Sequence, residues 1–250
     1  MPFHLSVFHA SVGLGPLQLN ALQEAVIAPS ANGFLVPPVI NKVIRVVGVG
    51  GLLNRAQLNS ASIRDYTPFD IDPVNVGVAC ESPVREIDLN DNPIPLVTNE
   101  ELDAFVTNSG AGPTRTTVGV VFADGPTTPV KGRMFTVHWT SAVALSAAFV
   151  WAAVTPVFDN GIPSGTFALV GSRQNSATAQ FHRFIPRGGP AYRPGTTSMT
   201  AYDGAQNMKD RYGRMGEWMR FTNTTPPTIE VLALAADATQ DGFLDLIQVG

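Results

Sequence analysis

Two segments of strand length that are apolar on both faces set the strongest limit on how this chain can fold. They lie within "TTVGVVFAD", which starts at Thr116, and "TIEVLALAAD", which starts at Thr228. Successive side chains of a strand point to opposite faces. The apolar side chains are Val118, Val120 and Phe122 against Val121 in the first segment, and Ile229, Val231 and Ala233 against Leu232 and Leu234 in the second. Strands of this kind belong in the middle of a sheet that a second layer covers, so the sequence predicts packed β-sheets.

The two segments close longer stretches that resemble each other, "FVTNSGAGPTRTTVGVVFAD" from Phe105 and "FTNTTPPTIEVLALAAD" from Phe221. Each contains an aromatic residue, a Thr-Asn pair, a loop with proline, an apolar strand and a closing Ala-Asp. The matching residues are Thr107 with Thr222, Asn108 with Asn223, Val118 with Val231 and Asp124 with Asp237. An offset near half the chain predicts two similar β domains in tandem. The alternative is a chance echo, because Thr-Asn and Pro-Thr are common loop pairs.

Composition favours many short strands and contacts between subunits. The 23 Gly and 20 Pro form no low-complexity tract, which indicates turns between strands. Charged residues make up 14 % of the chain, against about 25 % in a typical soluble domain, so much of the surface must be apolar or neutral. Residues 1–125 hold 6 Lys+Arg against 12 Asp+Glu, a net charge of −6, and residues 126–250 hold 10 against 8, a net charge of +2. This asymmetry is too small to indicate a nucleic-acid-binding domain.

Three features of the sequence argue against a disulfide framework, a secretory signal and a transmembrane helix. The one cysteine, Cys80, cannot form an internal disulfide framework. The start, "MPFHLSVFHASVGLG", has no basic region before its apolar residues, so no secretory signal is expected. The run "SAVALSAAFVWAAVTPVF" contains polar residues and a proline, so it predicts two buried strands or one bent strand rather than a transmembrane helix.

Three segments predict short helices. "GPLQLNALQEAVIAP", with Pro16 in a first turn and Pro29 at the end, predicts an amphipathic helix in an N-terminal arm. This helix could pack on its own domain, or dock on a neighbour or a membrane surface. "TNEELDAF", residues 98–105, predicts a brief helix capped by Thr98 or Asn99. "YDGAQNMKDRYGRM", residues 202–215, predicts a helix with Asp203 as its cap and an apolar stripe of Ala205, Met208, Tyr212 and Met215.

The prediction is therefore an all-β chain of tandem jelly-roll β-sandwiches, with a short N-terminal helix and a helix inserted late in each half. The expected limits are an arm over residues 1–38, a first jelly roll over 39–128 and a second over 129–250, with "DGPTTPVKG" (residues 124–132) as linker. One larger sandwich remains an alternative. This arrangement resembles the double jelly-roll major capsid proteins of icosahedral viruses and phages, over residues 40–250. The resemblance implies a homotrimer with a pseudo-sixfold outline, sandwiches that stand upright on the capsid and, often, an internal membrane beneath the shell.

Candidate metal and catalytic residues are few. His138 and His182 lie in predicted strands without adjacent carboxylates, His4 and His9 are poorly spaced for a shared metal, and Cys80 has no neighbouring histidine. "DATQDGFLDLIQ" places Asp237, Thr239, Asp241, Gly242 and Asp245 as in a calcium loop, but Gln248 stands where the bidentate Glu is required. A hairpin turn at Asp241-Gly242 is the favoured interpretation. The loop "DLNDNP", with Asp88 to Asn92, is a second weak calcium candidate. No catalytic, cofactor or metal residue is therefore predicted.

A group of arginines is interleaved with aromatic residues in the second half. Its members are Arg183, Arg187, Arg193, Arg211, Arg214 and Arg220, with Phe184, Tyr192, Tyr212 and Trp218. Such a group could bind single-stranded nucleic acid or form contacts between subunits. The small net charge of this half favours the subunit contacts.

The expected function is that of a virion structural protein that self-assembles, as trimers, into an icosahedral shell. Its partners would be copies of itself, with minor capsid proteins and an internal membrane as further partners at the inner face, and its place would be the virion capsid. Nucleic acid is not expected as a direct specific partner. The alternative is a carbohydrate-binding β-sandwich, such as a lectin-like or phage spike module, which could use the loops "DNGIPSG" or "DLNDNP". An enzyme is not expected, because no carboxylate pair or activated nucleophile stands out.

Overall fold

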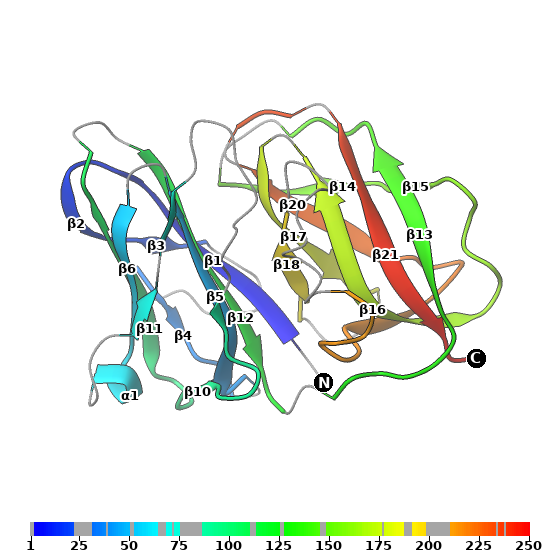
Figure 1. Cartoon of the computed structure of the whole chain (residues 1–250), viewed down its shortest axis with the longest axis horizontal. Coiled ribbons are helices and arrows are strands. Elements are labelled where there is room, and N and C mark those ends of the chain that lie inside the picture. Colours follow the sequence, from blue (N-terminus) through cyan, green and yellow to red (C-terminus); the bar gives the residue numbers. More distant parts are fainter. Residues whose placement is uncertain are drawn as a thin grey trace. The chain divides into compact units, whose positions relative to one another are not determined.

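The structure, a computed structural model, is an all-β chain. It describes residues 3–22, 32–38, 40–50, 53–64, 69–71, 73–75, 87–110, 114–125, 128–145, 149–176, 178–187, 192–198, 211–233, 235–237 and 239–250. The strands among these residues form four sheets and pair mainly in antiparallel fashion (Figure 1). Among them only Ala61–Arg64 (α1) forms a helix. In the described residues, no helix has the length and apolar character needed to cross a membrane.

The described residues divide into two compact units, called here the first unit, within residues 4–124, and the second unit, within residues 125–250 together with Phe3. The main division lies between residues 124 and 125. The division falls at the start of the segment that the sequence indicates as a linker. The limits 1–38, 39–128 and 129–250 stay a prediction.

The first unit contains two sheets. Its strands are β1 (Phe3–Val12), β2 (Gly15–Gln18), β3 (Asn20–Ala21), β4 (Phe34–Leu35), β5 (Lys42–Gly50), β6 (Leu53–Asn59), β7 (Phe69–Ile71), β8 (Pro73–Asn75), β9 (Ile87–Asp88), β10 (Ile94–Pro95), β11 (Glu101–Asn108) and β12 (Thr114–Ala123). One sheet has the order β10-β5-β12-β1-β3, with β8 and β9 also paired to β5, and the other has the order β2-β11-β6-β7, with β4 paired to β11.

The second unit also contains two sheets. Its strands are β13 (Met134–Ser141), β14 (Trp151–Val154), β15 (Val157–Phe158), β16 (Thr166–Asn175), β17 (Ala179–Ile185), β18 (Gly195–Thr197), β19 (Met219–Thr222), β20 (Thr228–Ala233) and β21 (Gln240–Gln248). The sheet orders are β15-β13-β21-β16-β19 and β14-β20-β17-β18.

Both units follow one strand order. Eight strands of each unit can be counted along the chain: β1, β2, β5, β6, β7, β10, β11 and β12 in the first, and β13, β14, β16, β17, β18, β19, β20 and β21 in the second. When these eight strands are numbered 1 to 8 in chain order, the strands of one sheet in each unit lie in the order 1-8-3-6 and those of the other in the order 2-7-4-5. Even the small edge strands correspond, because β3 lies beside β1 and β15 lies beside β13.

The two doubly apolar segments form interior strands, as the sequence predicts. β12 lies between β5 and β1, and β20 lies between β14 and β17. The predicted side chains of both faces are buried in the described residues: Val118, Val120, Val121 and Phe122 on β12, and Ile229, Val231, Leu232 and Ala233 on β20. Leu234 lies outside the described residues.

The repeat inferred from the sequence is displaced by one strand. The echo equates β11 with β19 and β12 with β20, since these strands carry its Thr-Asn pairs and its apolar runs. The sheet order instead equates β11 with β20 and β12 with β21. The duplication is present in the strand order, but the loop pairs that suggested it do not occupy equivalent positions.

The three predicted helices are not supported. Residues 15–21 form β2 and β3, which pair with β11 and β1, and residues 23–29 lie outside the described residues. Residues 101–105 belong to β11, where Leu102, Ala104 and Val106 are buried with the period of a strand and pairing with β6 overrides the capping pattern. In the third segment residues 211–215 form turns, because Tyr212 and Gly213 have positive φ angles that a right-handed helix excludes. Residues 202–210 lie outside the described residues.

Candidate functional site

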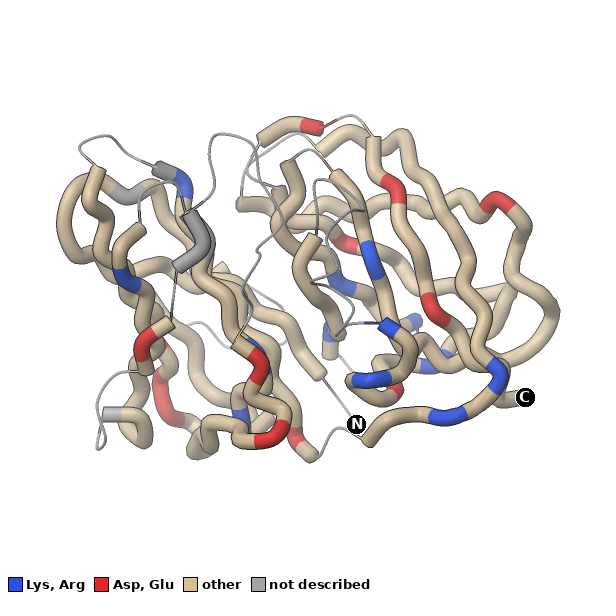
Figure 2. The backbone as a smooth tube through the Cα atoms, viewed as in Figure 1, with Lys and Arg blue, Asp and Glu red and all other residues tan. Residues whose placement is uncertain are grey.

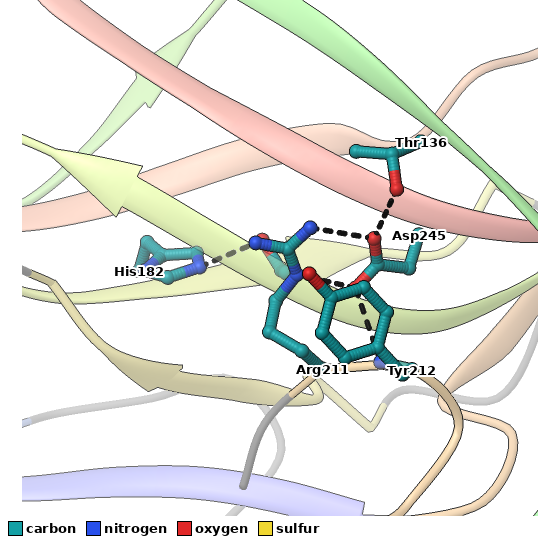
Figure 3. Close-up of polar contacts among 6 residues, drawn as sticks. Thr136, His182, Arg211, Tyr212 and Asp245 are labelled. Carbon is teal, nitrogen blue, oxygen red and sulfur yellow. Dashed lines mark hydrogen bonds and ion pairs between the residues drawn. The ribbon is translucent and has the colours of Figure 1, made fainter. Parts of the chain in front are cut away.

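A buried ion pair joins a turn of the second unit to strand β21. Asp245 is fully buried and Arg211 is 5 % exposed. Arg211 Nε donates to Asp245 Oδ2, and Arg211 Nη2 donates to Oδ1 at 2.7 Å. Thr136 Oγ1 on β13 donates to Oδ1 at 2.7 Å, and the main-chain N of Tyr212 donates to Oδ2 at 3.2 Å (Figure 3). Both carboxylate oxygens are therefore satisfied by several donors, which is the condition for holding a charge in a protein interior.

The turn over residues 211–216 positions Arg211. Gly213 N donates to Val170 O at 2.9 Å, and Val130 N donates to Gly213 O at 3.2 Å. Gly213 has φ +73°, and a Cβ there would lie 2.8 Å from Val130 O. Glycine is required at this position because any side chain would push the turn away from the sheet. The guanidinium of Arg211 also lies 4.8 Å from the centre of the Tyr212 ring.

This geometry excludes Asp245 as a calcium ligand. Its oxygens are occupied by Arg211, Thr136 and Tyr212. The described residues include no group of three His, Cys, Asp or Glu side chains that could hold a metal ion. In the second candidate loop, Asp88 Oδ1 accepts hydrogen bonds from the main chain and the side chain of Asn90, as in a local turn. Absence of calcium binding stays a prediction.

The hairpin turn expected at Asp241-Gly242 is wrong, because both residues lie inside β21. Gly242 faces Trp139 on β13, and a Cβ at Gly242 would approach the Trp139 ring to 2.9 Å and would also collide with Arg173 O. The glycine is thus required for the close approach of an indole, a role that sequence alone does not distinguish from a turn.

A row of polar side chains crosses the interior of the second unit from His182 on β17. The His182 ring lies 2.8 Å from Ser172 Oγ on β16 and 3.1 Å from Ser198 Oγ. Ser198 Oγ donates to Gln174 Oε1, and Gln174 Nε2 donates to Gln240 Oε1 at 2.7 Å. All five residues are buried, and burial lowers the pKa of His182 to about 3. His182 is therefore neutral at physiological pH and is a structural histidine.

A second charged group joins β17, β20 and the segment that precedes β18. Arg183 Nε donates to Glu230 Oε2 at 2.7 Å, and Arg193 Nη1 donates to the same oxygen at 3.0 Å. The Arg183 guanidinium also lies 3.9 Å from the centre of the Trp151 ring, a cation–π contact.

The arginine group predicted from the sequence therefore has several separate roles. Arg183 and Arg193 share Glu230, Arg211 pairs with Asp245, and Arg220 pairs with Glu217 at the surface. Arg187 and Arg214 are exposed. Since Arg183 and Arg211 are buried, their guanidinium groups cannot reach the phosphates of a nucleic acid. Figure 2 shows the charged positions thinly spread along the described backbone.

Sequence reasoning missed the carboxylates around His138. Its Nδ1 lies 2.6 Å from Asp159 Oδ2, and its Nε2 lies 3.8 Å from Asp241 Oδ2. These partners are distant in sequence, so no local motif could have revealed them. His4 and His9 lie on β1 at odd spacing and so point to opposite faces, and Cys80 lies outside the described residues.

A polar pocket of about 540 Å³ lies in the second unit, where β13 and β16 end and β21 begins. Its lining includes Asp237, Thr239 and Asp241, three of the residues that the sequence singled out for calcium. The pocket thus brings that stretch together with Thr140 and Ser141 of β13 and with Asn175 of β16.

No family model matches this chain, and no curated protein matches it. Among solved structures, one described as "Crystal Structure of the STIV MCP", a viral major capsid protein, is similar over 99 % of this chain and 97 % of that chain. The two sequences are 8 % identical and the TM-score is 0.27. A distant likeness of this kind does not establish a function.

Proposed function

We propose that this chain is a structural capsid protein built from two jelly rolls in tandem, which self-assembles into the shell of a virion. The observation that carries the proposal is the strand order shared by both units, 1-8-3-6 in one sheet and 2-7-4-5 in the other. This nested order is that expected for a jelly roll of eight antiparallel strands. Two such units in one chain resemble the double jelly-roll major capsid proteins.

The surface of the chain supports self-assembly. Large apolar side chains are exposed at turns and at a sheet edge, among them Leu14 (72 %), Val97 (61 %) and Val157 (64 %). Val157 lies on β15, which forms the edge of its sheet. Exposed apolar side chains and a low charge fraction lower the cost of removing a surface from water on association.

The proposed assembly unit is a homotrimer, and the proposed location is the virion capsid. Minor capsid proteins and an internal membrane are proposed as further partners at the inner face. The proposed role needs no catalytic group, because assembly depends on complementary surfaces.

Light scattering on the purified chain over a wide concentration range tests this proposal. We expect a trimer mass or a shell-sized particle. Replacing an interfacial apolar residue by lysine, as in Leu14→Lys, Val97→Lys or Val157→Lys, should lower the mass for at least one variant without changing its thermal unfolding. Asn160→Lys, at an exposed polar position, is the matched control. A monomer at every concentration would contradict the proposal.

A further inference from the structure

One turn of the second unit displays an exposed aromatic ring from a strained position. Tyr212 has a φ of 60° and is 47 % exposed. A positive φ is costly for a residue with a large side chain, so it persists where the surrounding structure fixes it. Here the buried Arg211–Asp245 pair and the hydrogen bond from Tyr212 N to Asp245 Oδ2 hold the turn (Figure 3). The second unit thus presents a fixed tyrosine at its surface, and tyrosine is a common anchor of protein interfaces.

Three exposed cations lie close to this turn. Arg214 belongs to the turn itself. Lys131 follows Val130, whose main-chain N donates to Gly213 O at 3.2 Å, and Arg133 lies two residues further along the chain. Within the described part of the chain, no carboxylate pairs with these three side chains. The basic patch is defined here as Lys131, Arg133, Tyr212 and Arg214.

One end of the first unit carries the opposite charge. Asp124 follows β12, and Asp91 lies in the turn between β9 and β10. Both carboxylates are exposed, and neither has an ion-pair partner among the described residues. The strands β10 and β12 lie on either side of β5, where the partly buried Lys42 pairs in register with Pro95 and Ala123. The two carboxylates therefore belong to the same end of this sheet.

An exposed apolar side chain lies at the same end. Val97 is 61 % exposed. The turn that holds it is joined to the strand ends, because Leu96 N donates to Asn41 O at 2.7 Å and Asn41 N donates to Ala123 O at 3.3 Å. The acidic patch is defined here as Asp91, Val97 and Asp124.

A ring of three copies requires two different surfaces on each chain. Around a threefold axis one surface of each copy meets another surface of the next, whereas a self-complementary surface makes a pair. The basic patch and the acidic patch are opposite in charge, and each offers one large exposed side chain, Tyr212 or Val97. The whole sequence shows the same contrast, with a net charge of −6 over residues 1–125 and +2 over residues 126–250.

A nucleic acid fits the basic patch less well than a second copy does. A base could stack on Tyr212 beside the cations. However, Arg220 adds no free charge to this unit, because it is paired with Glu217. The excess of acidic residues in the first half of the chain would also repel a phosphate backbone.

We infer that the basic patch of one copy binds the acidic patch of the next copy, with the Tyr212 ring packed against Val97. This inference rests on the proposed self-assembly and names the surfaces that make the contact. Arg211 and Asp245 are positioning residues for it, because they fix the turn that carries Tyr212. Opposite charges set the orientation of the contact, since the reversed pairing would bring like charges together.

Charge reversal and charge exchange on the full chain, followed by light scattering, test the inference. Lys131→Glu with Arg214→Glu makes the basic patch acidic, and Asp91→Lys with Asp124→Lys makes the acidic patch basic. Each double variant should assemble about a hundredfold more weakly than the wild type, because like charges meet at the contact. An equimolar mixture of the two variants, and one chain with all these substitutions, should recover assembly.

Tyr212→Asn tests the ring, because asparagine adopts a positive φ more readily than tyrosine. This variant should assemble about tenfold more weakly while its thermal unfolding temperature is unchanged or higher. Arg55→Glu with Arg115→Glu is the matched control for charge. It reverses two exposed cations of the first unit outside both patches and should leave assembly nearly unchanged.

The outcomes separate this inference from the proposed function. If the wild type assembles and the double reversals also assemble, or if the chain with all substitutions unfolds like the wild type but does not recover assembly, the inference is overturned and the proposed function stands. A wild type that stays monomeric, with no association in the mixture, would contradict both. A single-stranded oligonucleotide that binds the wild type but not Tyr212→Asn, while that variant assembles normally, would also overturn the inference.

Discussion

The two units share one strand order but fill their interiors differently. In the first unit the Phe34 ring stacks on Phe8 at a centroid distance of 4.9 Å and meets Phe122 edge-on at 5.4 Å. In the second unit the interior contains the row from His182 to Gln240 and the Arg211–Asp245 pair, beside aromatic contacts such as that of Phe135 with Phe167. The first unit also buries polar side chains, among them His4, Arg45 and Asp103, so the comparison is between its phenylalanine cluster and the hydrogen-bonded polar network of the second unit.

The difference predicts different responses to mutation. An apolar interior is filled by volume, so a similar apolar side chain can replace another at modest cost. In a buried polar network, removing one member leaves its partner without compensation. All three tryptophans, Trp139, Trp151 and Trp218, belong to the second unit, so tryptophan fluorescence reports its unfolding separately.

The largest effect is expected for Asp245→Ala. This change leaves the Arg211 charge buried without its carboxylate, at a cost of about 3–5 kcal/mol in the free energy of unfolding of the second unit. Urea unfolding followed by tryptophan fluorescence measures it.

Two controls sharpen this prediction. The double variant Arg211→Met with Asp245→Leu removes both charges and should recover much of the loss. Asp70→Ala removes a carboxylate from the exposed Arg55–Asp70 pair of the first unit and should change stability far less, because water and salt screen that pair. Equal effects of Asp245→Ala and Asp70→Ala would show that burial is not the deciding factor.

A smaller loss is expected for Gly242→Ala. The added Cβ meets the Trp139 ring and Arg173 O, and overpacking of this kind costs about 1–3 kcal/mol. Gly13→Ala in the first unit is the control, since no atom lies within 4 Å of a Cβ there. If Gly242→Ala left the free energy of unfolding unchanged, that result would contradict the packing described around Trp139.

Acid should weaken the second unit through His182. The pKa of His182 is about 3 in the folded state, and its ordinary value of 6.5 applies in the unfolded state. Between pH 3 and pH 6.5 the unfolded state therefore binds a proton that the folded state does not. The stability that neutral His182 contributes is complete above pH 6.5 and is lost by about 1.4 kcal/mol per pH unit on acidification. Partial burial lowers the pKa of His9 in the first unit in the same direction.

The pH slope of unfolding from pH 6.5 to 5, followed by tryptophan fluorescence, measures this effect. His182→Gln should flatten the slope even if it also lowers stability. An unchanged slope in the variant would assign the acid sensitivity to other groups.

The smallest loss of the series is expected in the phenylalanine cluster of the first unit. Phe122→Leu should lower the stability of the first unit by less than about 1.5 kcal/mol, because the Phe8–Phe34 stack can repack around it. Circular dichroism follows this change, with the tryptophan signal of the second unit unaltered. A loss as large as that of Asp245→Ala would remove the contrast between the phenylalanine cluster and the buried polar network.

Parts of this organisation could be predicted from the sequence because they depend on local periodicity. The doubly apolar runs at Val118 and Val231 identified interior strands, since burial on both faces leaves a direct mark. Helical patterns failed where pairing between distant strands overrode local preference, as in β11. The Asp241-Gly242 pair suggested a turn because the indole that requires the glycine is distant in sequence.

The candidate sites were harder to predict, because their partners meet only in space. Ser172 on β16 and Ser198, which follows β18, flank His182, and the polar pocket brings Asp241 together with Asn175. The calcium-like spacing around Asp237 correctly marked an oxygen-rich segment, but only the structure separates Asp245, which is buried with Arg211, from Asp241, which faces the pocket.

Electron cryomicroscopy of the purified chain under assembly conditions tests whether it builds a shell from tandem jelly rolls. We expect closed particles whose subunits each contain two β-sandwiches, both with the order 1-8-3-6 in one sheet and 2-7-4-5 in the other. Dispersed monomers under all conditions, or subunits whose two halves differ in strand order, would contradict it.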